Sequence, residues 1–318
     1  MDHRDTDSLE DAVLSVLTGS PIELAAARTR TSPARLADAV GRYRAAGRAA
    51  LGPQPSGWHQ VNIEFADYPT AERSFRAHLL PALSSGAIGE WWFVRKHPCW
   101  RLRIHPGPDG RTADAIARIT EALDNTLALG EIRRWRPALY EPESVAFGGP
   151  EGIRLTHSLF HADSVGVLDY QQHAADGIEG LPGGKETSFL VAPLFLRAAG
   201  LEWGEQGDVW GRVEARRPLP AGVSPEQVSS MAAPLQRLLL TDARPAIANG
   251  PLTPLAGWIT GMQRGGRALA EAAHADNLQL GLRSLVTRHI LFHWNRLGFT
   301  AAQQAIWARA AREAILGS

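Results

Sequence analysis

The chain has 318 residues, 44% of them hydrophobic, and its 33 lysines and arginines are balanced by 33 aspartates and glutamates. This length suffices for one large or two ordinary domains, and the balanced charge gives no general attraction for nucleic acid or an anionic membrane. A single cysteine, Cys99, excludes an internal disulfide and a cysteine-rich metal site. No run approaches the ~18 apolar residues of a membrane span, and the charged opening MDHRDTDSLEDAV lacks the apolar region of a signal peptide. We therefore expect a soluble cytoplasmic protein that does not engage membranes.

Residues 1–50 predict a short N-terminal helical extension of three helices. Ser8 and the pair Ser32-Pro33 are typical of helix starts. A linker rich in glycine and proline follows at 51–57. Arginines at 42, 44 and 48 raise DNA binding as an alternative, but they are spread over two turns and the chain has no net charge. We predict no nucleic-acid partner; docking or peptide binding is at least as good an interpretation of this segment.

Residues 58–137 predict strands and helices in the order strand, helix, strand, strand, helix, strand. The strands are expected at 58–65, in two halves of 90–105 and at 131–136, with helices at 69–83 and 111–129. Proline has no amide hydrogen for a strand ladder, so His97-Pro98 divides the middle pair. This is the ferredoxin-like βαββαβ order, in which two helices cover one face of a four-stranded sheet.

Alternation along these strands predicts one apolar and one polar sheet face. The polar face is expected to carry the side chains of Gln60, Asn62, Glu64, Arg101, Arg103 and His105. It mixes amides, a carboxylate and two guanidiniums, so we expect a substrate or the rest of the chain to cover it.

Residues 138–318 predict a mostly helical region that forms a cleft with the sheet, so the fold class is α+β. The helices are expected at 152–171, 188–200, 225–242, 262–275, 277–294 and 300–316, with loops at 177–184 and 241–257.

Histidines four residues apart occur twice, as His157 and His161 and as His289 and His293. This spacing places both rings on one helix face and is compatible with a metal, but no third ligand stands out, so we predict no metal site. Hydrogen bonding or proton transfer, or an ordinary buried histidine, fits better. The sequence contains no P-loop, dinucleotide-binding glycine motif, HExxH or GxSxG.

Four motifs in the same order and at similar intervals resemble the C-terminal, elimination-type domain of lantibiotic dehydratases. They are WWFVRKHPCWRLRI from residue 91, YEPESVAFGG at 140–149, LFHADS at 159–164 and FHWNRLGF at 292–299. The resemblance covers about 58–318 and is closest to small stand-alone members that act in thiopeptide biosynthesis, the pyridine synthases.

The resemblance implies one of two activities, neither of which needs a cofactor. Elimination domains remove glutamate from glutamylated serine or threonine of a peptide. Pyridine synthases join two dehydroalanines in a formal aza-[4+2] cycloaddition and then expel water and the leader peptide, leaving a pyridine-centred macrocycle. Elimination-type members carry an arginine where this chain has Ala146, and a histidine where it has Leu291. We therefore expect a pyridine synthase, with a modified precursor peptide as partner.

The expected site residues follow from this chemistry. Glu64 and His161 are the acid–base candidates, with Tyr140 and His293 as further donors. Arg101 and Arg103 would polarise or position carbonyls, Asn62 would bind substrate, and Trp58, Trp91 and Trp92 would form an aromatic wall for azoles. A stand-alone glutamate-elimination subunit and a non-catalytic precursor-binding protein are the alternatives, and a homodimer is left open.

Overall fold

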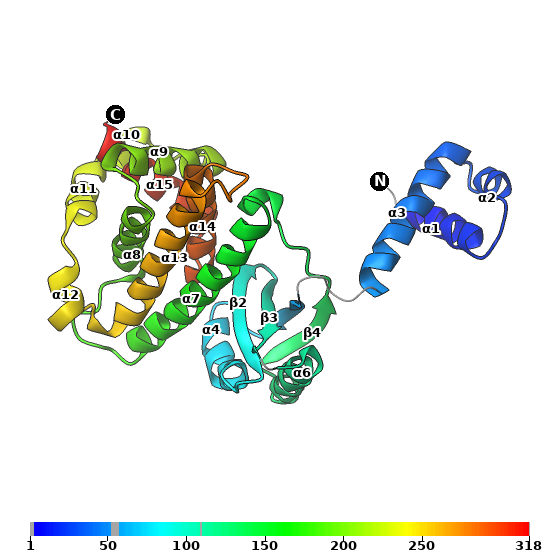
Figure 1. Cartoon of the computed structure of the whole chain (residues 1–318), viewed down its shortest axis with the longest axis horizontal. Helices are drawn as coiled ribbons and strands as arrows, with labels where there is room; N and C mark the ends of the chain where they lie inside the picture. The colour runs from blue at the N-terminus through cyan, green and yellow to red at the C-terminus, as the bar shows by residue number, and fades with distance from the viewer. Residues whose placement is uncertain (1–2, 52–56, 109, 318) are drawn as a thin grey trace. The chain divides into compact units, whose positions relative to one another are not determined.

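The computed structural model describes residues 3–51, 57–108 and 110–317, and its contacts divide the chain into two compact units, Met1–Gly57 and Trp58–Ser318. Figure 1 labels helices and strands of both units. The division falls at the end of the stretch 51–57, which the sequence predicts to be a linker.

The first unit consists of the helices α1 (His3–Leu17), α2 (Ile22–Arg28) and α3 (Pro33–Leu51). Small side chains make its core: Ala12, Val13, Ala25, Ala26, Leu36, Ala39 and Val40. The predicted cap before Pro33 is confirmed, because the Arg35 amide donates to Ser32 Oγ at 3.2 Å. The predicted start at Ser8 is wrong, since α1 already begins at His3. Of the three arginines considered for DNA, Arg44 is exposed, and the side chains of the other two lie outside the described ones.

The second unit begins with a four-stranded antiparallel sheet in the order β2-β3-β1-β4. Its strands are β1 (His59–Phe65), β2 (Ile88–Lys96), β3 (Cys99–Pro106) and β4 (Ile132–Ala138). All four predicted strands are therefore confirmed to within a few residues, including the break at His97-Pro98. The mixed α+β class is confirmed as well.

Helices cover one face of this sheet (Figure 1). One helical segment runs from α4 (Ala71–Ser74) through a π-helical turn (Phe75–Leu79) into α5 (Leu80–Leu83), and α6 is Thr112–Ala128. The alternate residues predicted for the apolar face are all nearly inaccessible: Val61, Ile63, Phe65, Trp100, Leu102 and Ile104. Phe75 packs against Trp100 and Phe93, so aromatic rings dominate this interface.

The remaining chain is helical and closes around a core that is continuous with the apolar side of the sheet. Its helices are α7 (Gly149–Ala175), α8 (Gly184–Ala198), α9 (Trp203–Arg216), α10 (Pro225–Ser229), α11 (Ala232–Leu240), α12 (Arg244–Asn249), α13 (Ala256–His274), α14 (Leu282–Leu297) and α15 (Ala301–Leu316). The expected loop at 241–257 instead contains α12 and a 3₁₀ turn, Thr253–Leu255.

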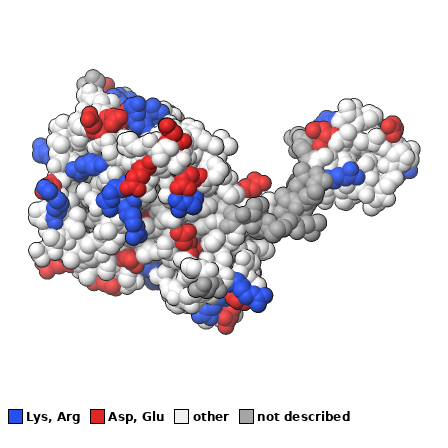
Figure 2. All heavy atoms as spheres, in the orientation of Figure 1, with Lys and Arg blue, Asp and Glu red and all other residues white. Residues whose placement is uncertain are grey.

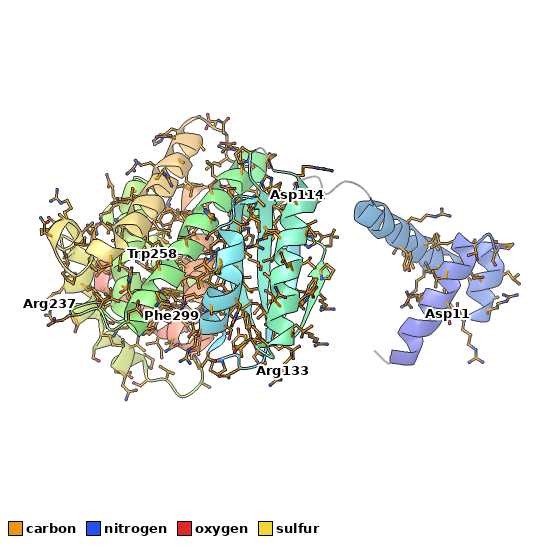
Figure 3. The ribbon with its side chains drawn as sticks, turned by 90° about the horizontal axis from the view of Figure 1, so that it is seen from below. Asp11, Asp114, Arg133, Arg237, Trp258 and Phe299 are labelled. Carbon is orange, nitrogen blue, oxygen red and sulfur yellow. The ribbon has the colours of Figure 1, made fainter. Side chains whose placement is uncertain are left out.

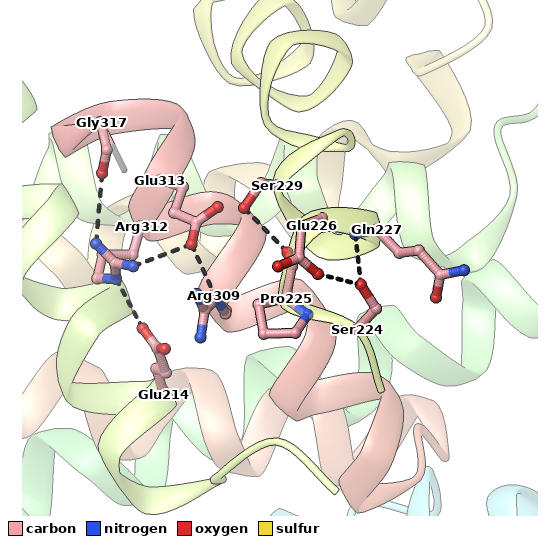
Figure 4. A network of polar contacts seen from close by, with 10 residues as sticks. All are labelled: Glu214, Ser224, Pro225, Glu226, Gln227, Ser229, Arg309, Arg312, Glu313 and Gly317. Atoms are coloured by element: carbon pink, nitrogen blue, oxygen red, sulfur yellow. Dashed lines mark hydrogen bonds and ion pairs between the residues drawn. The ribbon is translucent and has the colours of Figure 1, made fainter. Parts of the chain in front are cut away.

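Helix α9 was missed by the sequence analysis because three glycines lower its helix propensity. Packing explains one of them: a Cβ at Gly207 would lie 2.6 Å from the Leu316 side chain of α15. Arg312 of α15 also donates to Glu214 of α9 at 2.7 Å, within the polar network of Figure 4. Close contact with α15 therefore stabilises a helix that its own sequence does not favour.

Helix α7 covers the edge of the sheet at β2. Edge strands present unpaired backbone groups, and here two side chains of α7 bind them. The Phe93 amide donates to Ser164 Oγ at 3.3 Å, and His161 Nδ1 lies 2.9 Å from the Trp91 carbonyl oxygen and 3.2 Å from its nitrogen. The chain itself thus covers the β2 side of the sheet.

Charges are mixed rather than clustered on the face drawn in Figure 2, where acidic and basic side chains alternate over the larger unit. This agrees with the zero net charge of the sequence. Among the described residues, no helix is both long and apolar enough to cross a membrane.

Candidate active site

A cavity of about 360 Å³ lies where the polar face of the sheet meets the helical region. Strands β2 and β3, the segment after β4, and helices α7 and α14 all contribute to it. Its lining residues are Trp92, Val94, Lys96, Arg101, Arg103, Tyr140, Glu141, Glu143, Phe147, Ile153, Phe160, Arg217, Phe292 and Asn295. We call this cavity the sheet pocket.

Arg103 is the most deeply held cation of the sheet pocket, with 7% of its surface exposed. Strand register places it beside Trp92 of β2 and Gln60 of β1. Its Nε donates to Gln60 Oε1 at 2.7 Å, and its guanidinium carbon lies 4.1 Å from the centre of the Trp92 ring. Burial lowers the pKa of Arg103 to about 9, so the guanidinium is still charged at neutral pH.

Two buried donors of the sheet pocket have no partner among the described residues: Arg103 Nη1 and Trp92 Nε1. A buried polar group without a hydrogen bond costs about 1–3 kcal/mol, and more when it is charged. Both groups belong to the same cross-strand pair, so they lie close together on one face of the sheet. An oxygen acceptor of a bound molecule would satisfy them.

Tyr140 and His157 form a hydrogen-bonded pair at the wall of the sheet pocket, with Tyr140 Oη 2.6 Å from His157 Nε2. Burial raises the pKa of Tyr140 and lowers the pKa of His157 to about 4, the latter helped by the charges of His105 and Arg103. At neutral pH the phenol therefore keeps its proton and the imidazole is uncharged. The phenol is suited to donate, with a neutral imidazole as its partner.

A buried ionic network lies behind the aromatic side of the sheet pocket. Asp163 Oδ2 accepts from Arg296 Nη1 at 2.8 Å, and Asp163 Oδ1 lies 2.9 Å from His293 Nδ1. Trp258 of α13, labelled in Figure 3, donates to the same carboxylate at 3.0 Å. Burial opposes the charge of Asp163, but these partners outweigh it and hold its pKa at about 2. The Arg296 guanidinium in turn stacks on Phe160, 4.3 Å from the ring centre, and so supports the pocket wall.

Four of the predicted site residues line the sheet pocket: Arg101, Arg103, Tyr140 and Trp92. Their motifs converge because β2 and β3 are paired and the segment after β4 returns across them.

Glu64 and Asn62 lie on the predicted polar face but outside the sheet pocket. Glu64 accepts from Arg134 Nε at 2.7 Å on the β4 side of the sheet, and Asn62 Oδ1 accepts from Gln60 Nε2 at 3.3 Å. The acid–base role of Glu64 stays a prediction; its ion pair with Arg134 directs the carboxylate toward β4, away from the sheet pocket at β2 and β3.

The predicted wall of three tryptophans also needs correction. Trp91 and Trp92 are consecutive strand residues and point to opposite faces, and Trp91 packs toward Phe75 on the apolar side. Trp58 is buried behind the sheet pocket, where its ring lies 4.4 Å from that of His157. The aromatic wall instead combines Trp92 with Phe147, Phe160 and Phe292.

Neither predicted catalytic histidine of the helices reaches the sheet pocket. His161 binds the backbone of Trp91 and lines a different cavity with Asp169, Trp258 and Arg264. His293 is 2% exposed and is enclosed by Asp163 and by Ser188, whose Oγ lies 3.0 Å from His293 Nε2. Among the described residues, no group of three or more histidine, cysteine, aspartate or glutamate side chains is arranged to hold a metal ion.

The sequence analysis missed several residues of the sheet pocket. Glu141 and Glu143 stand in the quoted YEPE motif, and Phe292 and Asn295 stand in FHWNRLGF, so the signal was present without an assignment. Arg217 gave no signal, because it follows the unrecognised helix α9.

Comparison with known protein families identifies the family of the chain. The family model described as the C-terminal part of lantibiotic biosynthesis dehydratases matches residues 58–315. The chain belongs to this dehydratase C-terminal family. The predicted relation is thereby confirmed, and the match covers the sheet and the helical region. No curated protein sequence matches the chain.

Two solved structures share the fold of this family member. The tRNA-dependent lantibiotic dehydratase MibB from Microbispora sp. 107891 is 19% identical, with a TM-score of 0.60; the match covers 83% of this chain and 28% of MibB. The pyridine synthase TbtD from thiomuracin biosynthesis is 14% identical, with a TM-score of 0.58, over 81% of this chain and 97% of TbtD. The family member thus spans about a quarter of the dehydratase and nearly all of the synthase.

Proposed function

We propose that this protein is a pyridine synthase of thiopeptide biosynthesis, acting on a modified precursor peptide. The observation that carries the proposal is the sheet pocket, in which unpaired buried donors of Arg103 and Trp92 lie against an aromatic wall. The similarity in fold to TbtD supports it, as does the alanine at 146, where elimination-type members carry an arginine.

In the proposed reaction the pocket residues orient and polarise the substrate. One amide reacts as its iminol tautomer and forms the new ring with a second alkene. Arg101 and Arg103 would donate to the carbonyl oxygen that becomes more basic in this step. Holding both alkenes within reacting distance is worth roughly 7–11 kcal/mol in well-oriented systems, and the aromatic wall would provide that orientation for flat azole rings.

Aromatisation then expels water and the leader peptide as its amide, and each departing group gains from a proton donor. Tyr140 is our candidate, because it lines the sheet pocket and keeps its proton at neutral pH. Glu141 and Glu143 at the same pocket replace Glu64 as the carboxyl candidates.

We also propose that the sheet and the helices α4 to α6 form a ferredoxin-like unit, which the strand order β2-β3-β1-β4 supports.

A glutamate-elimination subunit is the second candidate. The cations Lys96, Arg101 and Arg103 of the sheet pocket would also suit a glutamyl carboxylate, and the similarity to MibB agrees with this alternative.

Two substrates separate these functions. The purified protein is incubated in parallel with a dehydrated, azole-bearing precursor and with its glutamylated counterpart, and the products are analysed by mass spectrometry. A pyridine synthase releases leader peptide amide and a matching macrocycle from the first and leaves the second unchanged. Loss of glutamate from the second peptide, without macrocycle from the first, would identify the elimination subunit. Binding without any change in mass would indicate the non-catalytic peptide-binding protein.

A further inference from the structure

The helical wall of the sheet pocket carries two polar residues that no motif assigned, Arg217 and Asn295. They come from different elements: Arg217 follows α9, and Asn295 lies in the last turns of α14. A third residue, Gln304 of α15, connects them and is only 1% exposed.

Gln304 has its orientation fixed by the backbone. Its Nε2 donates to the Phe299 carbonyl at 2.9 Å and to Asn295 Oδ1 at 3.0 Å, while its Oε1 accepts from Arg217 Nε at 3.0 Å. A carbonyl can only accept and a guanidinium can only donate, so the reversed amide would face two mismatched partners. The buried glutamine therefore has one stable orientation.

This orientation determines what the neighbours present to the sheet pocket. Because Asn295 Oδ1 is used by Gln304, its Nδ2 donor group points the other way. Arg217 uses Nε for Gln304 and Nη1 for the Arg216 carbonyl, which leaves Nη2 for a ligand. The helical wall thus offers donors, opposite the donors of Arg101 and Arg103 on the sheet.

We propose that Arg217 and Asn295 form a second substrate-binding wall, oriented by the buried Gln304, that holds main-chain carbonyl oxygens of the modified peptide. The inference rests on the proposed peptide substrate. Donors on both sides of an aromatic cavity match an extended backbone, whose carbonyls alternate in direction and whose azole rings lie flat between them. Arg217 and Asn295 are binding residues in this account, and Gln304 is a positioning residue.

Peptide affinity tests the wall separately from turnover. The affinity of the full chain for a fluorescent dehydrated precursor is measured by fluorescence anisotropy. The variants are Arg217→Ala and Asn295→Asp. The control is Arg216→Ala, because Arg216 is exposed and lies outside the sheet pocket. Asn295→Asp keeps the shape and the acceptor for Gln304 but removes the Nδ2 donor. We expect about 10-fold weaker binding for the first two variants, typical of a lost charge-assisted or buried hydrogen bond, and less than about 2-fold change for the control.

Gln304→Ala tests the positioning role. It should weaken binding in the native background but have no further effect in Arg217→Ala/Asn295→Ala, whereas a purely structural role would lower affinity in both. Native affinity in both Arg217→Ala and Asn295→Asp would overturn the inference, even if the protein forms macrocycle. If these variants bind the peptide more weakly but the native protein makes no macrocycle, the proposed binding wall would be supported and the pyridine-forming function rejected. A native protein that neither binds nor converts the peptide would contradict both.

Discussion

At the scale of single residues, the site depends on side chains whose charge is set by burial. Arg103 keeps its charge beside the Trp92 ring, while His157 and His289 are buried as neutral imidazoles. Burial keeps both histidines neutral by lowering their pKa, whereas Arg103 stays charged despite the burial that lowers its own pKa. The protonation of the site is therefore linked to the stability of the fold.

These histidines should make the free energy of unfolding decrease as the pH is lowered. Burial lowers the pKa of His157 to about 4 and that of His289 to about 3, against an ordinary value of 6.5. Below about pH 6.5 the unfolded chain binds protons that the folded chain does not, so the free energy of unfolding decreases as the pH falls from about 6.5 to about 4, and for His289 to about 3. Urea unfolding at several pH values should show a shallower pH dependence for His157→Gln than for the native chain. Identical slopes would mean that His157 is not buried as the neutral form.

The sequence predicted the pocket residues that alternation and motif order could place. Arg101, Arg103 and Trp92 are adjacent in a hairpin, so pairing alone brings them together. His161 and His293 could not be placed, because their environment depends on which helix face packs inward. Alternation already separates Trp91 from Trp92, so that part of the predicted wall conflicted with the strand pattern itself.

At the scale of elements, α7 links the sheet to the helical region through its side chains. Ser164 is central, since its Oγ accepts from the Phe93 amide at 3.3 Å and from Arg296 Nε at 3.1 Å. One hydroxyl therefore satisfies a backbone donor of β2 and a buried guanidinium behind the sheet pocket.

Removing this hydroxyl should destabilise the fold. Ser164→Ala leaves two buried donors without an acceptor, so we expect the free energy of unfolding to fall by about 1–3 kcal/mol. Ser158→Ala on the same helix is the control: Ser158 is exposed and donates to Glu90, and we expect a change within about 0.5 kcal/mol. Equal effects in urea denaturation would show that α7 is not held to β2 through Ser164.

Elements with strong local signals were predicted well, and those fixed by tertiary contact were not. The strands alternate clearly and α6 ends at a glycine, so both follow from the sequence. Helix α9 contains glycines that favour a loop, and its packing against α15 and α14 stabilises it.

At the scale of the whole molecule, the family match and the sheet pocket lie within the same unit, Trp58–Ser318. The three helices of the first unit lie outside the matched residues 58–315. Family membership establishes the scaffold, whereas the reaction depends on which donors and acids the sheet pocket presents to a peptide.

The most direct test of the account compares two arginines of the same sheet face in single-turnover macrocycle formation. Arg103 lines the sheet pocket, whereas Arg134 pairs with Glu64 outside it. The account predicts that Arg103→Ala lowers the rate by about 100-fold or more, as expected for a lost donor to a developing negative charge, while Arg134→Ala stays within about 3-fold of the native chain. Native-like turnover by a folded Arg103→Ala variant, or an equal loss in Arg134→Ala, would contradict the assignment of the sheet pocket as the active site.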